Sequence, residues 1–245
     1  MKTQVLISNN NRESLRQLTH TLEDSGIPDD ARIIYEARNV IGVVGDLCIK
    51  SYKTPGLIKR IIYSYFRHPK AERAFFAAAH LRDMGIDTPT PRILVVVKEK
   101  GLLTRSYFAC DYYADWATLR GVEKRRDFPE LAAALASFMK KIHSQGVLLR
   151  DFSPGNILFH KKDDRTFEFS VIDINRIQFG INDRNRLLNA FGKVLDTREG
   201  VEVLAREYAK GTPYVPEELV EIYDRAQASI RRNRRFKNLF RKNKK

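Results

Sequence analysis

Residues 150–159 read RDFSPGNILF, with an aspartate and an asparagine five positions apart at Asp151 and Asn156. The apolar end of this stretch and the polar turn 161–165 predict a short β-hairpin, and Asp173 follows its second strand. A tight Ser-Pro-Gly turn with an asparagine at a permissive backbone position would explain the first part alone. It would not explain a second aspartate at the end of the next strand. We therefore expect the three polar side chains to act together.

This spacing resembles the one with which protein-kinase-like enzymes place one base and two magnesium ligands. The resemblance implies that Asp151 orients an acceptor hydroxyl and accepts its proton, while Asn156 and Asp173 hold metal against the phosphates of ATP. Mg²⁺ suits these residue types, because it prefers carboxylate and amide oxygens and fills its other positions with water and phosphate. The implied cofactors are ATP and Mg²⁺.

The same resemblance implies a strand lysine paired with a helix glutamate, which together position the nucleotide phosphates. Lys50 lies in a predicted strand, and Glu72 follows 22 positions later in a predicted helix over 70–84. Lys53 is the alternative to Lys50. A solvated surface lysine and an acid favoured by the helix N-terminus remain open as structural readings of the two residues.

Three departures from the protein-kinase pattern are visible. The phosphate-covering loop Gly-x-Gly-x-x-Gly is missing: residues 36–39 read EARN, and the nearest glycine is Gly42. We therefore expect backbone amides and Arg38 to contact the phosphates. Residues 173–175 read DIN in place of Asp-Phe-Gly, and Leu149 stands where a histidine is usual. None of these changes removes the base or a metal ligand.

The hydrophobic pattern predicts an α+β chain, and the resemblance implies a two-lobed, protein-kinase-like fold. The N-lobe, residues 1–112, is expected to hold a five-stranded antiparallel sheet with one main helix. An N-terminal extension over 1–30 adds a short strand and a helix. A mostly helical, reduced C-lobe follows at 113–230 and a basic tail at 231–245, with ATP and Mg²⁺ expected near a hinge at 108–115. The five strands are predicted at 32–37, 40–44, 47–52, 93–98 and 105–111.

Six short stretches together resemble the lipopolysaccharide kinase family, the Kdo and heptose kinases of the bacterial inner core. They are Cys48–Tyr52, Lys70–Arg73, Leu81–Pro91, Ile142–Gly146, Arg150–Leu158 and Val171–Asn175. The resemblance spans about residues 32–190. It implies ATP-dependent phosphorylation of a sugar hydroxyl on a lipid-linked sugar, with Kdo on lipid A as the expected acceptor, at the cytoplasmic face of the inner membrane.

Other features of the sequence exclude several classes of substrate and of protein. Only 72 residues follow Asp173, and they lack a suitably placed Ala-Pro-Glu motif, so we expect no peptide substrate. Two cysteines 62 positions apart exclude a disulfide scaffold, and no run reaches the ~20 apolar residues of a membrane span. Two alternatives stay open: a small-molecule kinase of the aminoglycoside or choline type, and a pseudokinase that acts as a membrane-binding module.

The positive charge of the chain is concentrated in two segments. The net charge is +14, of which residues 231–245 carry +9 and residues 50–73 carry +6, so the other 206 residues are close to neutral at −1. Apolar side chains accompany the charges in 56–69 and in the tail, a combination that favours an anionic membrane surface. Nucleic acid is the less favoured partner, because no nucleic-acid-binding motif is present. We expect a cytoplasmic protein, peripheral at the inner membrane.

Overall fold

A computed structural model of the chain describes residues 2–8, 13–163 and 166–242. The chain forms two compact units. The sheet unit comprises residues 1–114 together with 172–176, and the helical unit comprises 115–171 together with 177–245. Residues 172–176 thus return to the first unit, although the predicted lobe boundaries place them in the second.

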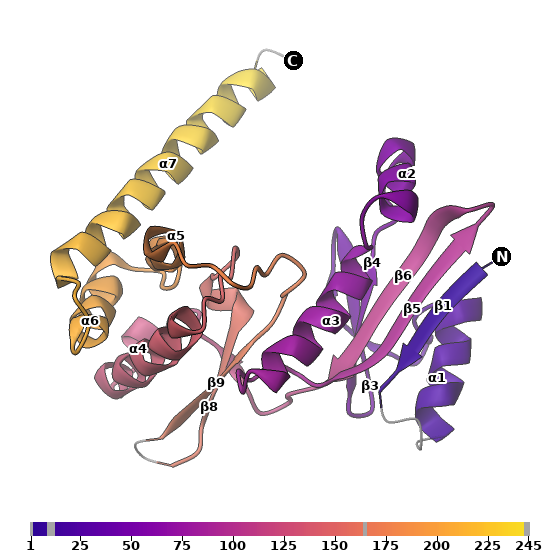
Figure 1. Ribbon diagram of the computed structural model, residues 1–245, viewed down its shortest axis with the longest axis horizontal. Coiled ribbons are helices and arrows are strands. Elements are labelled where there is room, and N and C mark those ends of the chain that lie inside the picture. The colour runs from indigo at the N-terminus through magenta and orange to yellow at the C-terminus, as the bar shows by residue number, and fades with distance from the viewer. Residues whose placement is uncertain (1, 9–12, 164–165, 243–245) are drawn as a thin grey trace. The chain divides into compact units, whose positions relative to one another are not determined.

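The sheet unit contains a six-stranded antiparallel sheet in the order β1-β5-β6-β4-β3-β2 (Figure 1). The five predicted strands are confirmed as β2 to β6. The sixth strand, β1, pairs with the edge of β5 from Lys2 opposite Lys98 to Ile7 opposite Ile93. The N-terminal strand is therefore part of the sheet. The strands are β1 (Lys2–Ile7), β2 (Arg32–Glu36), β3 (Asn39–Val44), β4 (Leu47–Tyr52), β5 (Pro91–Glu99) and β6 (Leu102–Asp111).

Two helices cover opposite faces of this sheet, α1 (Glu13–Asp24) and α3 (Lys70–Asp83). Strand β5 is buried on both sides because its side chains alternate between the two faces. One set, Ile93, Val95 and Val97, packs in a core with three leucines of α1. On the other face Leu94 lies opposite Phe108, whose ring meets Phe75 of α3 edge to face at 6.5 Å. The predicted main helix is α3, and α1 buries the second face.

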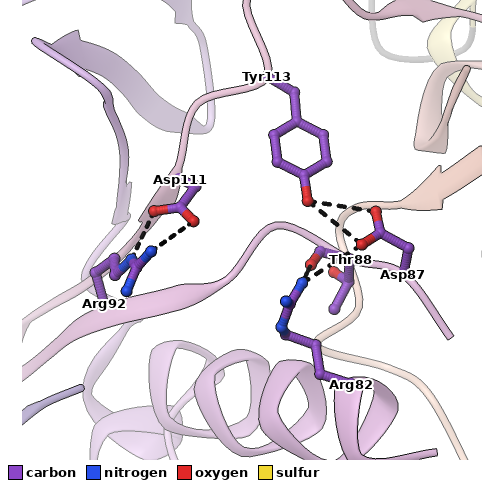
Figure 2. A network of polar contacts seen from close by, with 6 residues as sticks. All are labelled: Arg82, Asp87, Thr88, Arg92, Asp111 and Tyr113. Carbon is purple, nitrogen blue, oxygen red and sulfur yellow. Dashed lines mark hydrogen bonds and ion pairs between the residues drawn. The ribbon is translucent and has the colours of Figure 1, made fainter. Parts of the chain in front are cut away.

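Polar contacts fix the segment that joins α3 to β5 and the end of β6, as Figure 2 shows. The Arg82 guanidinium donates to the Thr88 carbonyl at 2.9 Å, and the Tyr113 hydroxyl donates to the Asp87 carboxylate at 3.3 Å. Nearby, a two-pronged ion pair joins Arg92 of β5 to Asp111 of β6 at 2.6 and 2.9 Å. Burial and the Asp87 charge raise the pKa of Tyr113 to about 12, so its hydroxyl remains a donor at neutral pH.

The helical unit packs its helices in sequence, α4 against α6 and α6 against α7 (Figure 1). Apolar residues at helical spacing, such as Leu131, Leu135 and Met139, form the buried stripe of α4. Helix α7 continues to Lys242, but of the predicted tail 231–245 only the side chains up to residue 234 are described, and these are exposed. The elements are β7 (Ala117–Thr118), α4 (Phe128–Ser144), β8 (Ile157–Lys161), β9 (Phe167–Val171), α5 (Arg184–Leu188), α6 (Arg198–Ala209) and α7 (Pro216–Lys242), with short 3₁₀ turns η1 (Val122–Lys124), η2 (Pro154–Asn156) and η3 (Asn189–Gly192).

Candidate active site

In the sheet unit, Lys50 and Asp173 form an ion pair. Lys50 lies on β4 directly opposite Phe108 of β6, which places it on the face covered by α3. Its Nζ donates to Oδ1 of Asp173 at 2.5 Å, and the Asn175 side-chain amide donates to the same oxygen at 2.7 Å. No donor among the described residues contacts Oδ2. One carboxylate oxygen is thus held by the protein, and the other is available to a ligand.

Asp173 has a left-handed backbone, with φ of 55°. Residues other than glycine adopt this conformation rarely, and when they do it is often at a functional site. Asn175, which replaces the glycine of the protein-kinase pattern, does not share it. Its role is instead the hydrogen bond to Asp173. The sequence marks this residue only as a departure, because a side-chain contact two residues away leaves no signal in the pattern.

Glu72 is buried at the start of α3, with 8% of its surface exposed. Its Oε1 lies 2.7 Å from Nδ1 of His68, four residues earlier. The predicted ion pair between Lys50 and Glu72 is therefore absent in the described structure. The reason is local, because each side chain has another partner within reach: His68 for Glu72, and Asp173 for Lys50. A buried carboxylate needs such a partner.

Positive charge gathers around Lys70 in the same unit. A cavity of about 390 Å³ is lined by Arg38, Lys53, Lys59 and Lys70. Burial, then the charges of Arg38 and other cations, lower the pKa of Lys70. The Nε atom of Arg73 is buried without a hydrogen-bond partner in the part of the chain described. Repelling cations around one cavity form a site suited to an anion such as phosphate.

In the helical unit, the loop that follows α4 positions Asp151 and Asn156. The Asp151 carbonyl accepts from the Ser153 amide and from the Asn156 side-chain amide, both at 2.9 Å. These bonds orient Asn156 with its own oxygen, Oδ1, free to accept a donor or bind a metal. The Asp151 side chain is exposed, and no described group donates to its carboxylate. The loop backbone is fixed while the carboxylate remains available.

The loop is supported by the segment after β7. The Leu119 amide donates to the Pro154 carbonyl at 3.0 Å, and the Arg120 guanidinium lies so close to Gly155 that a Cβ there would collide with it. Glycine at this position therefore permits the close approach of Arg120. Sequence reasoning missed Arg120, because nothing in its own neighbourhood indicates a contact 35 residues further along the chain.

The donor set fits Mg²⁺ in kind. Within the described residues no group of three or more His, Cys, Asp or Glu could hold a metal on its own. Asn156 and Asp173 offer one amide and one carboxylate oxygen, and a magnesium ion in a phosphotransferase typically has few protein ligands and several from phosphate and water. Each of the two residues, taken in its own unit, offers an oxygen of the kind that Mg²⁺ binds.

A family model matches residues 39–191, a span that contains every predicted site residue except Arg38. It describes the lipopolysaccharide kinase (Kdo/WaaP) family. The chain belongs to this family. Membership confirms the expected resemblance and makes the protein a kinase, a phosphotransferase of the lipopolysaccharide core. No curated protein matches the sequence well enough to count as a relative.

Solved structures agree on the fold of this lipopolysaccharide kinase. WaaP in complex with acyl carrier protein matches with a TM-score of 0.56 and 17% identity, over 94% of this chain and 97% of that one. A choline/ethanolamine kinase family protein from Mesorhizobium loti matches with a TM-score of 0.52 and 15% identity, over 86% and 81%. At such identities the likeness concerns the fold alone, and it confirms the protein-kinase-like α+β class.

Proposed function

We propose that this kinase transfers the γ-phosphoryl group of ATP to a sugar hydroxyl of a lipopolysaccharide inner-core glycolipid, with Kdo on lipid A as the acceptor. The observation that carries the proposal is Asp151. Its backbone is fixed by Asn156 and Ser153, yet its carboxylate is exposed and unpaired in the described structure. This is the arrangement expected of a group reserved for a substrate.

The sheet unit would position the nucleotide. ATP with Mg²⁺, when bound, supplies the phosphoryl group and the charge neutralisation that in-line transfer requires. Lys50, held by Asp173, would donate to phosphate oxygens, and Arg38 and Lys70 would add positive charge. Asp173 Oδ2 and Asn156 Oδ1 are the oxygens that would face the metal. Glu72 would keep α3 in place through its buried carboxylate.

Asp151 would act on the acceptor. An exposed carboxylate can accept a hydrogen bond from a sugar hydroxyl, which orients the hydroxyl oxygen toward the phosphoryl group. As that oxygen formed its bond to the γ-phosphorus, the bond from phosphorus to the β–γ bridging oxygen would break, ADP would leave, and the hydroxyl proton would pass to the Asp151 carboxylate. Because no donor in the described part of the chain competes for this carboxylate, it needs no rearrangement to do so.

The test is a phosphotransfer assay with purified Kdo–lipid A in anionic vesicles. Asp151→Asn should lower turnover by roughly 10³-fold, within the 10²–10⁴ range typical of an acid–base group. Its melting temperature should not change, because the carboxylate has no bonding partner among the described residues. Glu130→Gln, an exposed acid on α4, is the matched control and should keep full activity.

Three results would contradict the proposal. Activity of Asp151→Asn equal to wild type removes the catalytic role. Phosphorylation of choline or an aminoglycoside in place of the glycolipid favours a small-molecule kinase. ATP binding without turnover on any acceptor favours a pseudokinase.

We also infer that helix α2 (Leu57–Tyr65) binds the membrane that holds this acceptor. No residue of α2 is buried, and Ile58, Tyr65 and the following Phe66 are 76, 65 and 82% exposed. Two hydrogen bonds join α2 to the sheet: Arg60 donates to the Leu103 carbonyl and the Leu103 amide donates to the Ser64 hydroxyl, both at 2.8 Å. Ile58 and Phe66 are thus largely exposed, and Figure 1 shows α2 as a helix that projects from the sheet.

Such an orientation suits an interfacial helix. The basic segments 56–69 and 231–245 would add attraction to anionic lipids, about 1 kcal/mol for each Lys or Arg near the surface. No helix in the described part of the chain is long and apolar enough to cross a bilayer. Because apolar and basic side chains are exposed together on α2, we propose peripheral attachment at the cytoplasmic face of the inner membrane.

The same assay tests this attachment. Ile58→Asn/Phe66→Asn should lower activity on acceptor in vesicles but not on acceptor dispersed in detergent. Phe76→Asn replaces another exposed aromatic, on α3, and should behave as wild type in both. Equal vesicle activity of all three proteins would remove α2 from the membrane contact.

A further inference from the structure

The helical unit contains a second cavity, of about 560 Å³, beside the loop that carries Asp151. Arg150 and Phe152, the two neighbours of Asp151, both line it. The other walls come from α5, from η3 and Lys193 after it, and from the first half of α7. Four of its lining residues are cations and none is an acid. The cations are Arg150, Arg186, Lys193 and Arg225.

None of these cations has a carboxylate partner among the described residues. The Arg186 guanidinium donates to the Gln178 side-chain carbonyl at 2.8 Å, and Arg225 reaches only the backbone carbonyl of Glu221, at 3.4 Å. By contrast, Arg198 in the same unit pairs with both Asp224 and Glu202. Four like charges around one cavity repel one another, so an anion placed there would be strongly favoured.

Apart from Asn189, the rest of the wall is apolar or glycine. Leu148, Phe152 and Ile222 line the same space, and Phe152 is buried. A cavity of this size with both apolar and cationic walls is larger than a bare ion needs and suits a molecule with an anionic substituent on a bulkier body.

We propose that this cavity binds a phosphate monoester of the acceptor glycolipid and so holds the sugar beside Asp151. The inference rests on the proposed function, because it assigns part of the same acceptor. Three guanidinium groups and an ammonium favour a phosphate monoester, with a charge near −2, over a single carboxylate. Arginine forks also bind two phosphate oxygens at once. All residues that line the cavity belong to the helical unit. Lys50, Arg38 and Lys70, which are assigned to the nucleotide phosphates, belong to the sheet unit.

Binding can be measured without turnover. The probe is N-acetylglucosamine 1-phosphate, titrated calorimetrically into the full chain saturated with Mg²⁺ and a non-hydrolysable ATP analogue. Arg186→Gln/Arg225→Gln should weaken binding roughly tenfold or more for each guanidinium removed. Arg184→Gln/Arg206→Gln removes the same charge from exposed positions of the same unit that do not line the cavity, and should bind like wild type.

Unphosphorylated N-acetylglucosamine should not bind, and inorganic phosphate should bind more weakly than the sugar phosphate. Equal affinity for inorganic phosphate would mean a simple ion site and would overturn the proposal. So would equal binding by the two double variants. Lys193→Gln is a second variant in case the cavity pair fails to fold, and it should also weaken the sugar phosphate while leaving the melting temperature unchanged.

Kinetics separate this inference from the proposed function. With the phosphorylated glycolipid, the cavity pair should raise KM about tenfold or more with little change in kcat, whereas Asp151→Asn lowers kcat. With an enzymatically dephosphorylated glycolipid, the KM difference between wild type and the pair should vanish. If the kinase is active but its KM is the same in wild type and in Arg186→Gln/Arg225→Gln, the phosphate site is contradicted and the proposed function still stands. If the protein binds the sugar phosphate specifically but shows no turnover, the site is supported and the proposed function is contradicted.

Discussion

The candidate catalytic residues of the two units differ in how the protein treats their charges. In the sheet unit Lys50 is paired with Asp173 and Glu72 with His68. In the helical unit Asp151 and its neighbour Arg150 have no charged partner among the described residues. Groups that would hold the nucleotide are already fixed by one another, which is how a protein reduces reorganisation during the reaction. Groups that would contact the acceptor have no charged partner among the described residues and can bind the acceptor instead.

The largest expected effect in the sheet unit comes from breaking the pair at Lys50. Lys50→Met should lower kcat/KM for ATP about 10²-fold, the size typical of removing one preorganised donor. Lys53→Met is the matched control, since Lys53 is the nearby lysine that lines the cationic cavity instead, and it should lose only a few-fold. Steady-state kinetics with varied ATP measures both. A larger loss at Lys53 would move the phosphate contact to that residue.

One histidine in each unit, His68 and His143, extends the comparison to the pH dependence of stability. His68 is exposed beside Glu72, whereas His143 of α4 is half-buried, with its Nδ1 2.8 Å from the Tyr208 hydroxyl. Burial lowers the pKa of His143 from 6.5 to about 4. The folded protein therefore keeps His143 neutral where the unfolded chain binds a proton. Its contribution to stability is complete above pH 6.5 and is lost as pH falls toward 4, by at most about 3 kcal/mol.

Urea unfolding from pH 7 to pH 4 measures this loss. His143→Gln should flatten the decline over that range, although it lowers the starting stability. His20→Gln, at an exposed position on α1, should leave the slope as in wild type. A slope that does not respond to His143→Gln would place the acid sensitivity elsewhere.

The smallest expected effect on activity comes from substituting Glu72 and its partner His68 one at a time. Glu72→Gln should lower activity about tenfold, because a buried carboxylate at the start of α3 is lost. His68→Gln should change it by about twofold or less, since a glutamine side chain can still donate a hydrogen bond to the Glu72 carboxylate. The phosphotransfer assay compares them. If the two variants lose activity equally, the pair and not the carboxylate alone holds α3.

The sequence was informative where the signal is local. The strands β2 to β6 follow from alternation and turn residues, and the loop from Asp151 to Asn156 follows from its spacing. Sequence patterns did not predict contacts between residues that lie far apart in the chain. The pairing of β1 with β5 spans about 90 residues, and the partner of Lys50 lies 123 residues away. The cavity around Arg186 and Arg225 depends on how α5 and α7 pack, which no short pattern contains.

The position of β1 has a consequence for how this protein can be divided. The span matched by the family model, residues 39–191, leaves out β1, α1 and β2 at one end and α6 and α7 at the other. A polypeptide cut to that span would uncover one face of β5, including Ile93, Val95 and Val97, and would leave the edge of that strand unpaired. Such an edge invites pairing between molecules. The region that defines the family is therefore smaller than the region that can fold without aggregating.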